Sequence, residues 1–181
     1  IDVAIGPDQQ VFVLDARARQ VLRLERAPGF ADGDLVGPTA LTVVHRFAAD
    51  TSMPVAINVG GDGTIYVADR GARRVLALDG DQVDGTRAVA GNGTVRAAGD
   101  GTAALNAALY APAGMDFAAD GTLFFADRLN DAIRRVGTDG IIRSAADLPL
   151  SQPEDIAFDR QGRAFVADTG NDRVVRLDPD G

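Results

Sequence analysis

Four aspartates close short apolar runs that recur along the chain, and they are its most regularly placed carboxylates. The runs FVLD, YVAD, FFAD and FVAD end at Asp15, Asp69, Asp127 and Asp168. A carboxylate can act as an acid, a base or a metal ligand, but a residue at the same place in every copy serves what every copy needs. We therefore expect these strand-end aspartates to be structural, accepting hydrogen bonds from backbone N–H groups of the turn that follows.

Chemistry on a repeated scaffold depends on positions that differ between copies. Asn58 and Asp116, with Asp2 and Asp155 as further candidates, lie on the expected inner strands, where they could ring a central channel and hold an ion. Calcium takes about six to eight oxygen ligands, but the spacing of the acidic turns does not match an EF-hand. Calcium is thus a candidate cofactor, with Asn58 and Asp116 as candidate ligands.

A zinc site is not expected, because His45 is the single histidine and the chain has no cysteine. Catalytic zinc usually needs two or three His or Cys ligands. His45 lies in an apolar run that we expect to be an outer strand, far from any channel. The sequence therefore predicts no catalytic residue.

Arginines and amides gather in the loops that follow the four aspartates. They are Arg17, Arg19, Arg70, Arg73, Arg128, Asn130 and Asn171. The planar guanidinium group suits carboxylates, peptide carbonyls and anionic groups of sugars. We predict a binding surface on this loop face; the alternative is that the arginines pair with neighbouring acidic residues around the rim.

The elements that position these residues are short β-strands. Apolar residues recur twelve and ten positions before each aspartate and six and nine positions after it. Turns rich in Gly and Asp join the first two strands of each copy as a hairpin. A fourth apolar run follows at residues 41–47, 87–90 and 141–145.

The repeat length selects the fold. The aspartates are 54, 58 and 41 residues apart, which suits four-stranded propeller blades of roughly 40 to 50 residues. We predict an all-β protein, a β-propeller of four-stranded antiparallel blades in one domain over residues 1–181. The four expected blades cover about 1–50, 51–91, 92–147 and 148–181.

The fourth copy carries the clearest family resemblance. It runs from Pro153 through DIAFD and FVAD to a Gly-Asn-Asp-Arg turn and Leu177, and it is similar to the NHL-repeat family of β-propellers. The resemblance implies a non-catalytic scaffold that presents its loop face to a protein, peptide or glycan partner. The alternative is a calcium-dependent propeller enzyme of the lactonase, strictosidine-synthase-like or amidating-lyase type, although the histidines of the lyases have no counterparts here.

The fourth copy reaches Gly181 where the third, at Gly140, is about to enter its outermost strand. We expect a part of a larger, about six-bladed ring, whose remaining blades would be partners; the alternative is a four-bladed ring. Between the second and third copies, Thr102 is expected to cap a short helix over residues 103–109 that Pro112 ends.

Composition narrows the partners. The formal charge is −8 and the isoelectric point about 4.5, so nucleic acid is not expected as a partner. No stretch approaches the roughly 20 apolar residues of a membrane span. The absence of cysteine does not decide the compartment, for which we favour an extracellular, periplasmic or cell-surface place. Richness in Ala, Arg, Asp and Gly indicates a bacterial source.

Overall fold

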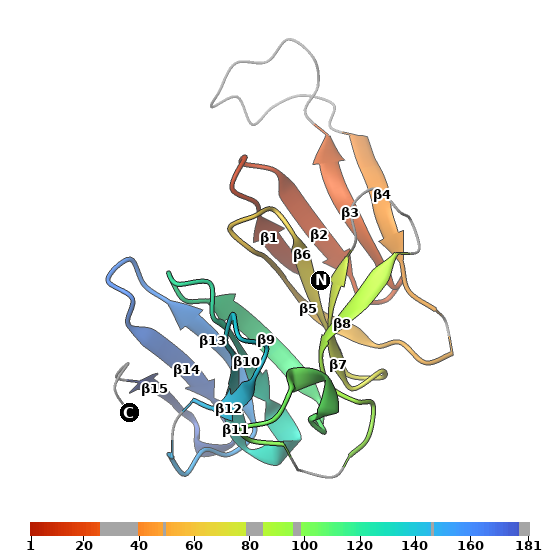
Figure 1. The fold of residues 1–181 in the computed structure, drawn as a ribbon. Coiled ribbons are helices and arrows are strands. Elements are labelled where there is room, and N and C mark those ends of the chain that lie inside the picture. The colour runs from red at the N-terminus through yellow and green to blue at the C-terminus, as the bar shows by residue number, and fades with distance from the viewer. Residues whose placement is uncertain (26–39, 49, 79–84, 96–98, 146, 178–181) are drawn as a thin grey trace.

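The fold is all-β and consists of four small antiparallel sheets in chain order (Figure 1). The computed structural model describes residues 1–25, 40–48, 50–78, 85–95, 99–145 and 147–177. Within them, three sheets have four strands and the last has three, each sheet running in sequence order from one edge to the other. The prediction of propeller blades is confirmed, including the outer strands of the first three blades.

Each blade is a meander of neighbouring strands. Blade 1 contains β1 (Asp2–Ile5), β2 (Val11–Asp15), β3 (Gln20–Glu25) and β4 (Ala40–Arg46). Blade 2 contains β5 (Pro54–Val59), β6 (Ile65–Asp69), β7 (Arg74–Leu78) and β8 (Thr86–Ala90). Blade 3 contains β9 (Pro112–Phe117), β10 (Leu123–Asp127), β11 (Ala132–Val136) and β12 (Ile142–Ser144). Blade 4 contains β13 (Pro153–Phe158), β14 (Ala164–Asp168) and β15 (Arg173–Leu177).

The hairpins between the first two strands follow from local turn chemistry. In blade 2 the N–H of Gly60 donates to the carbonyl of Thr64, and Gly63 has a φ of 84°, where a Cβ would be strained. The carboxylate of Asp62 accepts the N–H of Thr64 at 2.9 Å, which pins the turn. The same Asp-centred turn recurs at Asp120. In blade 4, Asp159 stands at the place of Gly60 and accepts the N–H groups of Gln161 and Arg163.

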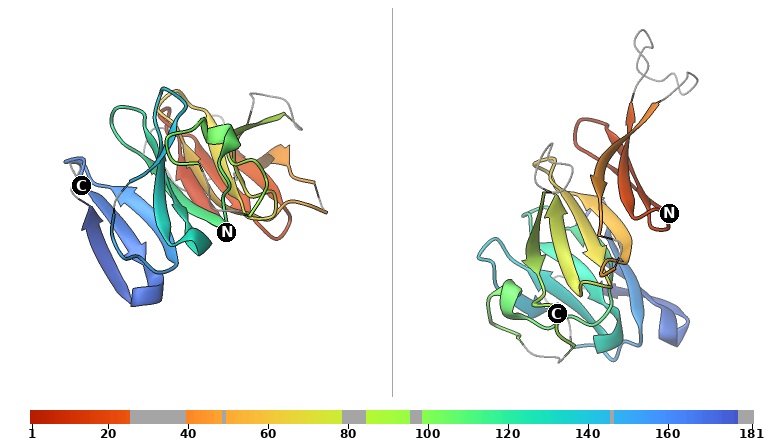
Figure 2. Two further views of the ribbon diagram at one scale, coloured as in Figure 1. Left: turned by 60° about the horizontal axis from the view of Figure 1, so that its bottom comes forward. Right: turned by 90° about the vertical axis from the view of Figure 1, so that its right-hand side faces the viewer.

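The inner strands β1, β5, β9 and β13 pack side by side in that order and form the wall of a channel. The blades fan out from this wall, and the first and fourth blades lie apart, so the sheets do not close into a ring (Figures 1 and 2). Loops that follow the strand-end aspartates lie beside the connections that enter the inner strands, because the N–H of Arg70 donates to Met53 and that of Leu129 to Tyr110. This loop face carries the channel mouth.

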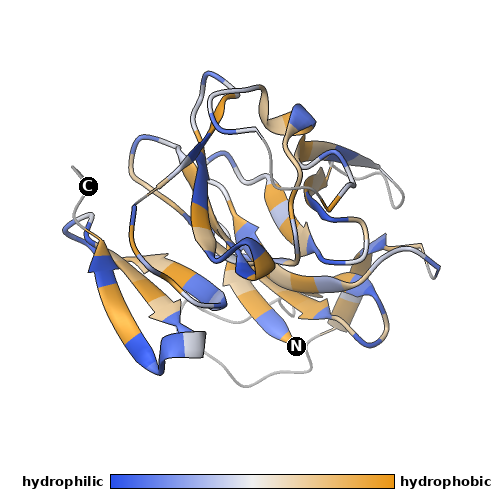
Figure 3. Cartoon of the chain, turned by 90° about the horizontal axis from the view of Figure 1, so that it is seen from below, coloured by the Kyte–Doolittle hydropathy of each residue, from blue (hydrophilic) through white to orange (hydrophobic). Residues whose placement is uncertain are grey.

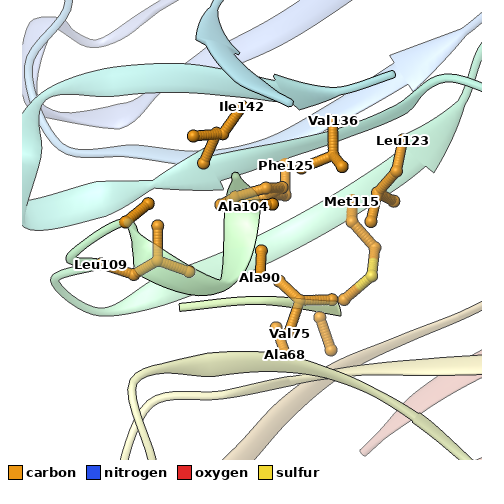
Figure 4. Close-up of a cluster of buried hydrophobic side chains, with 12 residues drawn as sticks. Ala68, Val75, Ala90, Ala104, Leu109, Met115, Leu123, Phe125, Val136 and Ile142 are labelled. Atoms are coloured by element: carbon orange, nitrogen blue, oxygen red, sulfur yellow. The ribbon is translucent and has the colours of Figure 1, made fainter. Parts of the chain in front are cut away.

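A separate apolar cluster fills each space between neighbouring blades. Alternate residues of each strand face one neighbour or the other, and the hydrophobic segments lie mainly in the strands (Figure 3). Between blades 2 and 3, Phe125 and Leu109 are fully buried beside Val75 and Met115 (Figure 4). The stability of the fold therefore comes from blade-to-blade contacts.

The prediction of a helix over residues 103–109 is wrong. A single 3₁₀ turn, Ala104–Asn106, forms there, and its cap Ala103 makes no side-chain cap hydrogen bond. Thr102 instead donates its hydroxyl to the carbonyl of Gly99 at 2.7 Å. The backbone is engaged elsewhere, since the carbonyls of Ala104 and Ala107 accept the N–H groups of Gly91 and Asn92. Tertiary hydrogen bonds to blade 2 thus override the helix propensity of the alanines.

His45 lies on the outer strand β4, as expected, with 3% of its surface exposed and its ring 4.5 Å from that of Phe47. It is remote from the inner strands that line the channel. Over the part of the chain that the structure describes, no helix has the length and apolarity to cross a membrane.

Candidate functional site at the channel mouth

The strand-end aspartates of blades 2, 3 and 4 are buried and bind two segments at once. Asp69 accepts the N–H of Ala72 in the loop that follows it, as the sequence predicts for this residue type. It also accepts the N–H of Met53 at 2.8 Å and the hydroxyl of Ser52, both in the connection from blade 1. Each carboxylate therefore clamps the connection that enters its own blade, a role that the repeat pattern alone does not reveal.

The other copies vary this arrangement. Asp127 accepts the N–H of Tyr110 at 2.7 Å and Asp168 that of Ser151 at 2.7 Å, again from the entering connection. Asp15 is only half-buried and accepts the single N–H of Ala18 at 2.9 Å. The clamp is thus complete in blades 2 to 4, and blade 1 has only its loop half among the described residues.

The two buried aspartates of blades 3 and 4 should titrate on opposite sides of 3.8. Burial raises the pKa of Asp127 and outweighs the hydrogen bonds from Asn130 and the N–H of Tyr110. Burial also acts on Asp168, but hydrogen bonds from Ser151, Asn171 and Arg173 outweigh it and lower its pKa. Carboxyl-carbon NMR titration should place Asp127 above 3.8 and Asp168 below it.

The direction in which pH changes the stability follows from proton binding by the native state. Stability from Asp168 is present above the unfolded pKa and is lost as the pH falls through its lowered folded pKa. Asp127 binds its proton in the native state at a higher pH than in the unfolded state, so acidification toward pH 3.8 adds stability there. Equal midpoints for the two carboxyls would contradict this assignment.

Arg70 and Arg128 converge on one carboxylate at the channel mouth. Arg70, directly after the aspartate of blade 2, donates Nη2 to Glu154 Oε2 at 2.7 Å. Arg128, at the same place in blade 3, pairs through Nε with Glu154 Oε1. Glu154 lies on the inner strand of blade 4, so a single ion-pair triad joins three blades. The side chains stay partly exposed, at 29% for Arg70, 25% for Arg128 and 35% for Glu154.

The other loop residues that the sequence singled out have different surroundings. Asn130 and Asn171 donate their amides inward to Asp127 and Asp168, at 2.8 and 2.9 Å. Arg73 has a φ of 53° and donates to the carbonyl of Gly93 at 3.4 Å. Two further members of the predicted set are an exposed Arg17 and a half-buried Arg19 in blade 1. The structure therefore brings together only Arg70 and Arg128 of the predicted set.

A cavity of about 440 Å³ extends from this triad along the inner strands. Its polar lining residues are Asp2, Asn58, Arg70, Asp116, Glu154 and Asp155. Burial, followed by repulsion from Asp2, Asp116 and Glu154, raises the pKa of Asp155, although its side chain remains accessible to solvent. The channel is therefore acidic, and Arg70 is the one cation among the residues that line it in the described part of the chain.

The channel acids are engaged with backbone. Asp116 accepts the N–H groups of Phe117 and Phe158, one on each carboxylate oxygen and both at 2.8 Å. Asn58 donates to the carbonyl of Met115 at 2.8 Å. Among the described residues, no group of three or more His, Cys, Asp or Glu side chains is arranged to hold a metal ion.

Glu154 was missed by sequence reasoning, although a signal for it exists. Fourteen residues before each strand-end aspartate stand Ile1, Val55, Ala113 and Glu154. Only the last is polar, so a comparison of this position between copies would have singled it out. Its pairing with Arg70, 84 residues earlier, depends on the stacking of blades and is invisible in a linear pattern.

Comparisons with known proteins identify a repeat in the sequence and the fold of the chain. Residues 150–177 match the NHL repeat, in agreement with the resemblance of the fourth copy. No curated protein sequence matches the chain. An auxiliary nutrient binding protein from Bacteroides thetaiotaomicron VPI-5482 is similar in structure, with a TM-score of 0.74 at 17% identity, over 98% of this chain and 47% of that one.

Two further solved structures are similar. Virginiamycin B lyase from Staphylococcus aureus gives a TM-score of 0.67 at 14% identity over 99% of this chain and 52% of the lyase. A chain of a nidogen/laminin complex gives 0.73 at 21% identity over 99% and 60%. The chain spans about half the length of the first two, and at these identities the likeness shows the fold alone. The chain has a β-propeller fold that contains an NHL repeat.

Proposed function

Starting from a β-propeller with an NHL repeat, we propose that this chain is a non-catalytic scaffold that binds a protein, peptide or glycan partner on its loop face. The observation that carries the proposal is broken symmetry at the channel mouth. The residues directly after the strand-end aspartates are Ala16, Arg70, Arg128 and Thr169. A requirement of the blade itself would place the same residue type in all four copies.

The two arginines have the chemistry of a receptor for anionic or carbonyl groups. Their guanidinium groups come from different blades, and both pair with Glu154, which lines the cavity together with Arg70. Arg70 Nε is buried and has no hydrogen-bond partner among the described residues. Arginine donors on a preformed edge of a pocket suit carboxylates and carbonyls of peptides and acidic groups of glycans.

The solved structures add support of a general kind. A nutrient binding protein and a chain from a complex of nidogen and laminin share this fold. The first is named for binding and the second comes from a protein complex, which agrees with the proposed use of the loop face. The partner of the present chain and its bacterial origin remain part of the proposal.

A second candidate is a calcium-dependent enzyme that works in the channel. It is favoured by the carboxylates of Asp2, Asp116 and Asp155 beside the amide of Asn58 on the cavity wall, and by a shared fold with a lyase. Backbone N–H groups already occupy both oxygens of Asp2 and Asp116, which reduces the oxygens open to a cation. We therefore prefer the scaffold.

The test of the scaffold starts from peptides and glycans selected on the full chain from a random-peptide library and a glycan array. Arg70→Ala and Arg128→Ala should each lower the affinity of the selected ligands about tenfold or more, because a hydrogen bond to a charged group contributes roughly 1.5–3 kcal/mol. Arg143→Ala is the matched control, since Arg143 pairs with Asp139 away from the mouth. Equal affinities for all variants would overturn the proposal.

The response to calcium distinguishes the enzyme alternative from the scaffold. Melting with calcium and with a chelator should give the same midpoint for a scaffold. Saturating a site at about 100 times its dissociation constant adds roughly 2.7 kcal/mol, which raises the melting temperature of a chain of this size by about 5 °C or more. A rise of that size would support the enzyme and argue against the scaffold.

A further inference from the structure

Two recurring positions on the inner strands control how neighbouring blades meet at the channel. The first channel position lies thirteen residues before each strand-end aspartate and holds Asp2, Ala56, Gly114 and Asp155. The second lies eleven residues before it and holds Ala4, Asn58, Asp116 and Ala157. All but Ala4 line the channel cavity.

Asp2 at the first position and Asp116 at the second make the same two-sided contact, here called the channel latch. Asp2 accepts the N–H of the next residue, Val3, on Oδ1 and the N–H of Ile57 in the following blade on Oδ2, both at 2.9 Å. Asp116 does the same with Phe117 and, in the following blade, Phe158. One carboxylate therefore joins two inner strands.

The residue at the same position of the following blade decides whether the latch can form. Ala56 holds the position of Asp2 in the next blade, and Ala157 holds that of Asp116. Neither alanine has a side chain that could accept the N–H of the residue after it. Blade 3 instead has Asp116, which takes the N–H of Phe117 for itself. The preceding blade presents the amide of Asn58 there, which donates to Met115 O and, at 3.3 Å, to Asp116 Oδ1. Acceptors thus face free N–H groups, and a donor faces a carboxylate.

Asp155 makes only the first half of the latch. Its Oδ1 accepts the N–H of Ile156 at 2.9 Å, and its Oδ2 has no hydrogen-bond partner among the described residues. It occupies the same repeat position as Asp2, whose Oδ2 reaches the next blade. Asp155 therefore has an acceptor ready for a blade on the open side of blade 4.

The open face of blade 4 also repeats a face that is buried elsewhere. Six residues after the strand-end aspartates, Val21, Val75 and Ile133 are 0%, 0% and 1% exposed between blades. The equivalent Val174 is 72% exposed. This face continues the interfaces already formed between blades 1 and 2, 2 and 3, and 3 and 4.

Blade 1 does not complement Asp155. Its first channel position holds Asp2, which already takes the N–H of Val3. If blade 1, of the same chain or of a second copy, packed on blade 4, carboxylate would face carboxylate with no N–H between them. We propose that the open face of blade 4 receives a further blade of the same repeat type, with a small uncharged residue at its first channel position, whose inner-strand N–H donates to Asp155 Oδ2.

The test adds such a blade to the full chain. A second copy of residues 141–181 is appended after Gly181, where the Asp-Gly pair at 180–181 repeats that at 139–140. Four proteins are compared. The original fourth blade, here called the resident blade, carries either Asp155 or the substitution Asp155→Asn. The appended blade carries either the copied aspartate or the substitution Asp155→Ala at that copied position. Unfolding by guanidinium and amide exchange of the appended inner strand are measured for each.

The latch predicts a coupled cycle. The protein with resident Asp155 and the appended Asp155→Ala substitution should be the most stable of the four, and resident Asp155→Asn should raise its unfolding equilibrium constant about tenfold. With the appended aspartate retained, resident Asp155→Asn should instead raise stability, because its amide can donate to the appended carboxylate as that of Asn58 donates to Asp116. Additive effects, or an appended inner strand whose amides exchange freely in all four proteins, would overturn the proposal.

Discussion

Asp69→Ala is expected to destabilise the protein by about 3–5 kcal/mol. The carboxylate is 1% exposed and accepts the N–H groups of Met53 and Ala72, at 2.8 and 3.0 Å, and the hydroxyl of Ser52. Its removal leaves three donors without their acceptor, and each buried unsatisfied group costs roughly 1–3 kcal/mol. The loss is large beside a typical total stability of about 5–15 kcal/mol.

Asp15→Ala is the matched control for this substitution. Asp15 ends the equivalent strand of blade 1, is half-buried and accepts one N–H, from Ala18. A loss of about 1 kcal/mol is expected. Denaturant unfolding of both variants, with the slope checked for constancy, makes the comparison. Similar losses for the two variants would show that the clamp on the entering connection contributes little.

Gly114→Ala is expected to destabilise the protein by about 3 kcal/mol. A Cβ at Gly114 would lie 1.9 Å from Asp155 Oδ1 and 2.8 Å from Asp155 Cα. A rotation of the aspartate side chain can relieve the first contact but not the second, which involves backbone. The inner strands β9 and β13 must therefore move apart, and overpacking of this kind typically costs roughly 1–3 kcal/mol or more.

Gly61→Ala provides the control for Gly114→Ala, because a Cβ there meets nothing within 4 Å and the residue lies in an exposed turn. It should be neutral or slightly stabilising, by about 0.4–1 kcal/mol at most. Asp155→Ala combined with Gly114→Ala should recover part of the loss and leave the backbone contact. Equal midpoints for Gly114→Ala and Gly61→Ala would contradict the close approach of blades 3 and 4.

Much of the fold could be predicted from the sequence because its repeat signals are local. Apolar alternation and Asp-Gly turns specify hairpins, and the four aspartates mark the register of each blade. The exception is the connection around Ala104. Hydrogen bonds from Gly91 and Asn92, which lie outside the stretch with helix propensity, fix the backbone there. Propensity fails there because the partners lie in another blade.

The candidate site could be predicted only in part. Arg70 and Arg128 stand out as arginines after a strand-end aspartate, but their common partner Glu154 depends on how three blades stack. The place of Asn130 in the same loop predicts a surface role, but its amide donates to the buried Asp127. A loop position does not show whether a side chain turns inward, since this depends on the depth of the buried carboxylate beside it.

The most direct test of the scaffold is hydrogen–deuterium exchange of the full chain with and without the tightest selected peptide or glycan. Binding at the channel mouth predicts slower exchange in the backbone segments around Arg70, Arg128 and Glu154, with the outer strands β4, β8 and β12 unchanged. Protection confined to those outer strands, with the segments at the mouth unchanged, would contradict the account.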